Sequence, residues 1–138
     1  GGPARESAGF SWLTMRLAQE EGAIIEQDND VTFLFPFNST EKDKDPAVDA
    51  YLKKLVEKHK ATKATCRVVG HTDDVRSPEA NHKLGLGRAQ AIARILQNNG
   101  IAANRIKVES KGETEPVASN ANDDGRHQNR RVVLTTNN

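Results

Sequence analysis

A helix pattern enclosed by two strand patterns is the feature that most limits how this chain can fold. Residues 65–69 and 106–108 are short runs rich in β-branched side chains, which are typical of strands. Between them, residues 78–97 carry apolar side chains at helical spacing. A strand–helix–strand unit places its two strands parallel through a right-handed crossover. The segment 65–109 therefore predicts a parallel strand pair covered by one helix.

Further patterns add strands and a second helix to this unit. Residues 31–37 place Val and Phe at alternate positions, which predicts a strand with one aromatic face. Asp45 and Pro46 are a good N-cap and first helical residue for a helix to about residue 60. Residues 132–134 predict a last strand. Together these elements predict an α+β fold, a two-layer sandwich with helices packed on one side of a mixed sheet.

Two segments lie outside these patterns. Residues 8–21 mix apolar and polar side chains and predict a short helix, and we interpret residues 1–30 as an N-terminal extension or linker. Residues 110–128 are largely polar and predict a long connection, of a length that is often functional. We therefore predict a single domain over residues 31–138.

Composition argues against several kinds of partner and site. The chain has 20 Lys and Arg residues and 19 Asp and Glu residues. It therefore lacks the excess of positive charge with which proteins bind nucleic acid nonspecifically. No apolar run approaches the roughly 20 residues that span a membrane, so we expect no membrane contact by this domain. The single cysteine, Cys66, excludes an intramolecular disulfide and a cysteine-built zinc site. We expect no metal and no cofactor.

One arginine projects from the apolar side of the predicted central helix. At about 100° per residue, Arg88 falls within the stripe formed by Leu84, Ile92 and Ile95. A buried guanidinium without an anionic partner costs several kcal/mol. The chain must therefore provide that partner, or a ligand must supply it.

Asp73, just after the first strand of the unit, is one candidate partner for Arg88. Asn81 projects from the same helical stripe, so a carboxylate, a guanidinium and a carboxamide converge where ligands usually bind to such units. This group suits a ligand with an ammonium for Asp73 and a carboxylate for Arg88. From spacing alone, an internal salt bridge between Asp73 and Arg88 is an equally good interpretation.

His71 allows two catalytic interpretations, both of them weak. With Asp73 and Asp74 it could bind a metal, but one histidine beside two carboxylates differs from most catalytic zinc sites. As a general base it would need a nucleophile, and neither Ser77 nor Cys66 lies on an elbow motif. We favour a histidine whose ring satisfies backbone groups of the turn.

Several motifs in register resemble the OmpA-like peptidoglycan-binding domain. The blocks are Phe33-x-Phe35-x-Phe37-Asn38-Ser39, Gly70-His71-Thr72-Asp73, Leu84-Gly85-x-x-Arg88-Ala89-x-x-Ile92, Asn98-x-Gly100-Ile101, Arg105-Ile106, Gly112-Glu113-x-x-Pro116 and Gly125-Arg126-x-x-Asn129-Arg130-Arg131-Val132. The resemblance runs from about Val31 to Thr135, and every block is in order.

The resemblance implies a βαβαββ fold and non-catalytic binding to the cell wall. It implies a domain on the periplasmic side of a Gram-negative envelope, associated with the outer membrane, that anchors a membrane-attached parent protein. The implied ligand is the diaminopimelate residue of the peptidoglycan stem peptide. The implied contacts are Asp73 and Arg88, with supporting positions at Asn38, Thr72, Asn81 and Arg130.

The chain departs from the family pattern at two positions near this site. Gly85 stands where serine is common, and Ser110 stands where glycine is usual. Neither change removes Asp73 or Arg88, so the implied ligand class is kept. Two other functions stay open: a hydrolase of cell-wall peptides that acts through His71 and Asp73, and the wall-anchoring domain of a motor or secretion complex.

Overall fold

Six strands form one mixed sheet in the computed structural model, which describes residues 14–16, 23–35, 46–59 and 62–137. The strands lie in the order β1-β2-β3-β6-β4-β5. They are β1 (Thr14–Arg16), β2 (Ala23–Gln27), β3 (Asp30–Leu34), β4 (Thr65–His71), β5 (Ile106–Gly112) and β6 (Arg131–Asn137). The helices are α2 (Pro46–His59), α3 (Pro78–Asn98) and α4 (Asp123–Asn129), with a 3-10 turn, η2 (Ala103–Arg105), before β5.

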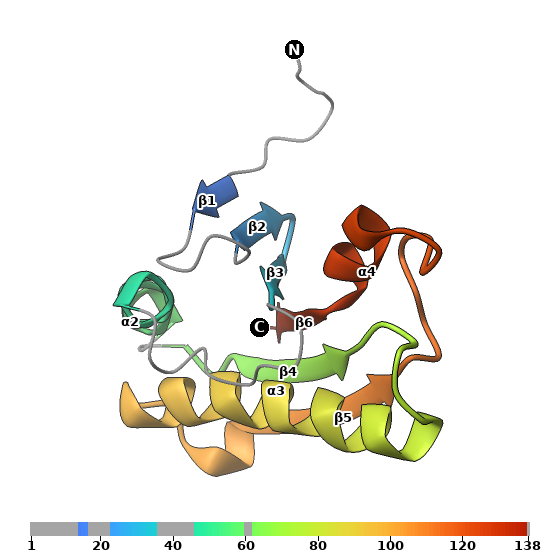
Figure 1. Ribbon diagram of the computed structural model, residues 1–138. Helices are drawn as coiled ribbons and strands as arrows, with labels where there is room; N and C mark the ends of the chain where they lie inside the picture. Colours follow the sequence, from blue (N-terminus) through green and yellow to red (C-terminus); the bar gives the residue numbers. More distant parts are fainter. Residues whose placement is uncertain (1–13, 17–22, 36–45, 60–61, 138) are drawn as a thin grey trace.

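The predicted parallel unit is confirmed and forms one edge of the sheet. β4 and β5 pair in parallel with Cys66 opposite Ile106, and α3 lies along both strands (Figure 1). β6 pairs antiparallel with β4 on one side and with β3 on the other. The α+β, mixed-sheet architecture is therefore as predicted.

One apolar core lies between the sheet and helices α2 and α3. Its side chains come from β2, β3, β4 and β6 on the sheet and from both helices. Phe33 of β3 and Tyr51 of α2 meet edge to face, with ring centroids 6.2 Å apart. Full burial of a large apolar side chain contributes about 1.5–3 kcal/mol. Alternate residues of β4, such as Arg67, face the solvent on the other side of the sheet.

Local signals fix the ends of α3. The Ser77 hydroxyl accepts a hydrogen bond from the Ala80 backbone N–H at 3.2 Å, and Pro78 is the first helical residue. Gly100, with φ of 117°, follows the last turn in a conformation that favours glycine. These caps explain why the sequence predicts this helix to within one or two residues.

Two expected segments differ from the structure. Residues 14–16, predicted as part of a helix, form β1, which pairs with β2, while the remainder of 8–21 lies outside the described residues. β2 in turn pairs with β3 and buries Ile24 against the core. The pairing of residues 14–16 with β2 outweighs their weak helical pattern. The proposed boundary at residue 31 stays a prediction.

The long polar connection also contains regular structure. β5 continues to Gly112, and Asp123–Asn129 forms α4. The Asn122 side chain caps this helix by accepting a hydrogen bond from the Gly125 backbone N–H at 2.7 Å. Within the part of the chain that the structure describes, no helix is both long and apolar enough to cross a membrane.

Candidate functional site

Asp73 lies in the turn directly after β4, where the backbone holds it in place. The Thr72 backbone N–H donates to the Gly112 carbonyl oxygen at 2.9 Å, and the Thr72 hydroxyl donates to the Asp73 carbonyl oxygen at 2.7 Å. The Val75 backbone N–H donates to Asp73 Oδ1 at 3.1 Å, which closes an Asx turn. Asp73 is only 3% exposed, so its carboxylate has a fixed and largely dry setting.

Arg88 lies in the buried stripe of α3, as the helical periodicity predicts. Its side chain is fully buried, and Nη1 donates to the His71 carbonyl oxygen at 3.2 Å. The guanidinium carbon lies 5.3 Å from the centroid of the Phe35 ring, a cation–π distance. Burial, together with the nearby Arg130 charge, lowers the pKa of Arg88 to about 10. Arg88 is therefore protonated at neutral pH and attracts an anionic group.

The ion pair of Asp73 is made with Arg130 rather than with Arg88. Arg130 Nη1 lies 3.3 Å from Asp73 Oδ2, and both side chains are buried. Arg130 Nε also donates to the Phe35 carbonyl oxygen at 3.1 Å, while the Phe35 backbone N–H donates to the Arg130 carbonyl oxygen at 2.7 Å. The internal salt bridge between Asp73 and Arg88 that spacing allowed is therefore replaced by one that joins β4 to the start of β6.

Asn81 projects from the first turns of α3 and is fully buried. Its Nδ2 donates to the Arg76 carbonyl oxygen at 3.1 Å and to Glu113 Oε1 at 2.8 Å. Its Oδ1 is buried without a hydrogen-bond partner among the described residues. Glu113 was not predicted as a site residue, and only its place in the Gly112-Glu113 block could have pointed to it.

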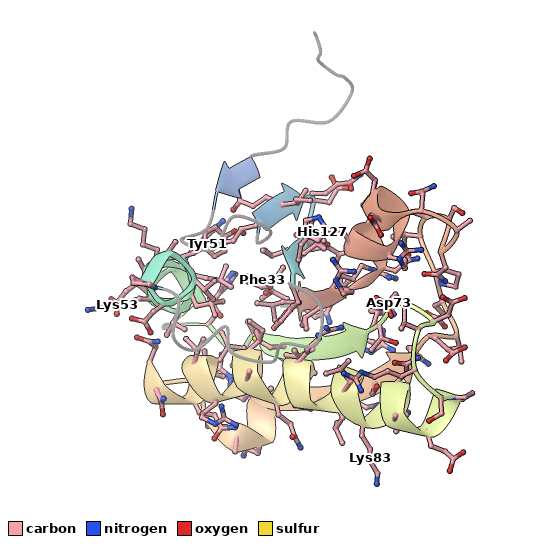
Figure 2. The ribbon with its side chains drawn as sticks, in the orientation of Figure 1. Phe33, Tyr51, Lys53, Asp73, Lys83 and His127 are labelled. Carbon is pink, nitrogen blue, oxygen red and sulfur yellow. The ribbon has the colours of Figure 1, made fainter. Side chains whose placement is uncertain are left out.

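The structure brings together most of the residues that the sequence singled out. Those gathered near the end of β4 are Thr72, Asp73, Asn81, Arg88 and Arg130. Figure 2 shows Asp73 just beyond the end of β4, on the side of the molecule where α3 begins. Asn38 lies outside the described residues. The cluster holds a carboxylate and two guanidinium groups, which can receive a cationic and an anionic group of one ligand.

His71 is buried and uncharged at neutral pH. Burial, followed by the positive charges of Arg131, Lys111 and Arg67, lowers its pKa to about 4. Its Nδ1 has no hydrogen-bond partner within the described residues, so this atom does not make the expected contact with the turn. Its carbonyl oxygen instead accepts the hydrogen bond from Arg88. Among the residues that the structure describes, no group of three His, Cys, Asp or Glu side chains is placed to hold a metal.

The two departures from the family pattern lie against each other. A Cβ at Gly85 would come within 2.5 Å of Ser110 Oγ. The Ser110 hydroxyl donates to the His82 carbonyl oxygen of α3 at 2.7 Å and accepts from the Gly112 backbone N–H at 3.2 Å. The hydroxyl on β5 thus takes the space that a side chain at position 85 would need.

We expect substitutions at these two positions to be coupled. Gly85→Ser alone should destabilise the domain by about 1–3 kcal/mol, because its Cβ overlaps the Ser110 hydroxyl. Ser110→Gly alone should lose about 1 kcal/mol of hydrogen bonding. The double variant should recover at least about 1 kcal/mol relative to the sum, measured by urea unfolding. Strictly additive losses would contradict this packing.

These features define a small α+β binding domain with a buried charged site at the end of its parallel strand pair. The OmpA family model matches residues 34–130 of the chain. The chain belongs to the OmpA family.

Relatives of this chain include large proteins of different kinds. A Gloeobacter violaceus protein named Photosystem I P700 chlorophyll a apoprotein A2 is 33% identical over 119 residues, which cover 82% of this chain and 13% of that protein. Peptidoglycan-binding protein ArfA of Mycobacterium tuberculosis is 36% identical over 93 residues, or 67% of this chain and 28% of ArfA. The chain thus spans less than a third of each of these curated relatives.

A solved structure agrees in fold. The peptidoglycan-associated lipoprotein from Burkholderia pseudomallei superposes with a TM-score of 0.68 at 27% identity. The match covers 77% of this chain and 89% of the lipoprotein chain.

Proposed function

We propose that this domain binds peptidoglycan without catalysis, through the diaminopimelate residue of the stem peptide. The observation that carries the proposal is a buried cluster at the end of β4, in which the Asp73 carboxylate pairs with Arg130 and the Arg88 guanidinium of α3 lies nearby on the His71 carbonyl oxygen. Diaminopimelate carries an ammonium and a carboxylate on one carbon, which matches these charges. The names of the relatives, peptidoglycan-binding protein and peptidoglycan-associated lipoprotein, support the same class of ligand.

In the proposed complex, the two poles of the ligand meet separate residues. Asp73 accepts hydrogen bonds from the ammonium, and Arg88 holds the carboxylate with a two-pronged contact. The supporting positions are Asn38, Thr72, Asn81 and Arg130. We further propose that the domain works on the periplasmic side of the envelope, as the anchor of an outer-membrane or other membrane-attached protein, including a motor or secretion complex.

The hydrolase alternative gains no support from the site. The low pKa of His71 makes its ring a weak base at neutral pH. The Ser77 hydroxyl already serves as the cap of α3 and lies at a helix end rather than on an elbow. We therefore do not propose catalysis.

The direct test is binding of Asp73→Asn to purified sacculi and to diaminopimelate. This change keeps the size of the side chain and removes its charge, so we expect a loss of about 2–5 kcal/mol in binding, enough to turn micromolar affinity into none that is detectable. Asp74→Asn, at the exposed neighbouring position, is the matched control and should bind like the unaltered domain. Thermal melting confirms that both variants fold. Equal binding by Asp73→Asn and the unaltered domain would refute the proposal.

A further inference from the structure

A second charged cleft lies at the start of β4, at the end of the strand away from Asp73. Its volume is about 300 Å³. It is lined by Thr65, Cys66, Arg67, Asn104, Arg105, Ile106, Lys107 and Asn137. Because β4 has seven residues at about 3.3 Å each, the two ends of the strand lie roughly 20 Å apart. The cleft is therefore separate from the proposed diaminopimelate site.

The register of the sheet places the polar side chains of this cleft on its solvent face. Arg67 of β4 is directly opposite Lys107 of β5, and Thr65 is opposite Asn137 of β6. Directly paired residues share a face, and this face is the one away from the buried Cys66. Two cations and two neutral polar side chains are thus gathered at one end of three neighbouring strands.

Arg67 and Lys107 share a single carboxylate. Glu109 accepts from Arg67 Nε at 3.1 Å and Nη2 at 2.9 Å, and its Oε2 lies 3.4 Å from Lys107 Nζ. Like charges placed directly opposite each other repel. The Glu109 carboxylate contacts both side chains, and Glu115 attracts Arg67 more weakly. The side chains are 48% and 75% exposed, so a dissolved ligand can reach them.

Arg105 adds a third positive charge in a fixed position. Its Nε donates to the Ala64 carbonyl oxygen at 2.7 Å, and its Nη2 donates to the Thr62 carbonyl oxygen at 3.3 Å. Carbonyl oxygens orient a guanidinium without cancelling its charge. The residues that line the cleft therefore include three cations, and the Glu109 carboxylate beside the cleft contacts two of them, Arg67 and Lys107.

We propose that this cleft binds an oxyanion, phosphate or carboxylate, carried on a sugar-sized ligand. Guanidinium and ammonium groups are strong donors to such oxyanions, and the Asn104 and Asn137 side chains line the same space. The volume is at the lower end of the range for small-molecule sites, which suits one charged sugar rather than a larger cofactor. The site gives the domain a second contact with anionic saccharides, independent of the first.

The test is a nuclear magnetic resonance titration of the domain at low salt with glucose 6-phosphate, glucuronate and uncharged glucose. We expect saturable shifts of the amides of residues 65–67, 104–107 and 137 with at least one charged sugar and none with glucose. The stronger of the two charged ligands identifies the oxyanion. Absence of saturable shifts with both charged sugars, or equal shifts with glucose, would overturn the proposal.

Matched variants separate this site from other charges. The double variant Arg67→Gln/Lys107→Gln should weaken binding about threefold to fivefold for each charge removed. Lys83→Gln should leave it unchanged, because Lys83 projects from α3 away from the sheet (Figure 2). Asp73→Asn should also leave it unchanged, so failure of the proposed diaminopimelate site would not affect the result. Unaltered affinity in the double variant would contradict the assignment.

Discussion

Gly70→Ala is expected to lower the free energy of unfolding of the domain severely. A Cβ at position 70 would lie 1.8 Å from the Gly85 carbonyl oxygen and 2.5 Å from its carbonyl carbon. Both are backbone atoms of α3, so the clash can be relieved only by moving the helix off β4. We expect a loss of about 3–5 kcal/mol, a large part of the stability of an ordinary domain. Urea unfolding followed by circular dichroism measures it.

Whether Gly70→Ala lowers or raises the free energy of unfolding distinguishes a steric clash from the ordinary effect of replacing glycine with alanine. Among the glycines that the structure describes, Gly100 and Gly112 have positive φ, and Gly70 does not. At a position that alanine can adopt without strain, Gly→Ala stabilises by about 0.4–1 kcal/mol, because it restricts the unfolded chain. A Gly70→Ala variant as stable as the unaltered domain would show that α3 and β4 are not this close.

Arg88→Ala is expected to remove ligand binding and much of the stability together. The side chain is the largest that is fully buried among the described residues, so its removal leaves a cavity beside Phe35 and deprives the His71 carbonyl oxygen of a donor. These losses together should amount to about 3–5 kcal/mol in unfolding free energy. Urea unfolding gives this change, and calorimetry with diaminopimelate gives the change in affinity.

Arg88→Lys separates the two effects. Lysine keeps the charge and much of the volume but cannot make the two-pronged contact with a carboxylate. We therefore expect it to retain more stability than Arg88→Ala and still to bind diaminopimelate at least about tenfold more weakly. Arg94→Lys, at an exposed position of the same helix, should change neither property. Tight binding by Arg88→Lys would contradict the assigned role of Arg88.

The parts of the fold that local signals determine could be predicted from the sequence. Ser77 and Pro78 begin α3, and the spacing of its apolar side chains placed Arg88 and Asn81 on its buried side. The strand–helix–strand order then fixed the parallel pairing of β4 and β5. Each of these inferences needed only residues close together in the chain.

The parts that depend on distant residues could not be predicted in this way. Asp73 pairs with Arg130, which is 57 positions away, and Asn81 contacts Glu113, which is 32 positions away. β1 is a strand because β2 offers it an edge to pair with, and β2 in turn pairs with β3, which the side chains of residues 14–16 do not indicate. Periodicity specifies which face of an element is buried, whereas the partner on that face follows only from the assembled sheet.

The ion pair between Asp73 and Arg130 has a consequence for how the domain holds a polymer. On the proposed binding mode, a ligand ammonium reaches a carboxylate that an internal cation already contacts. Binding then exchanges one charged contact for another, and the affinity of a single site reflects the small difference between them. Firm attachment to a wall with many identical stem peptides would come from several anchors engaged at once, since linked weak contacts gain avidity without any new interaction. Each anchor could release and rebind while the others hold.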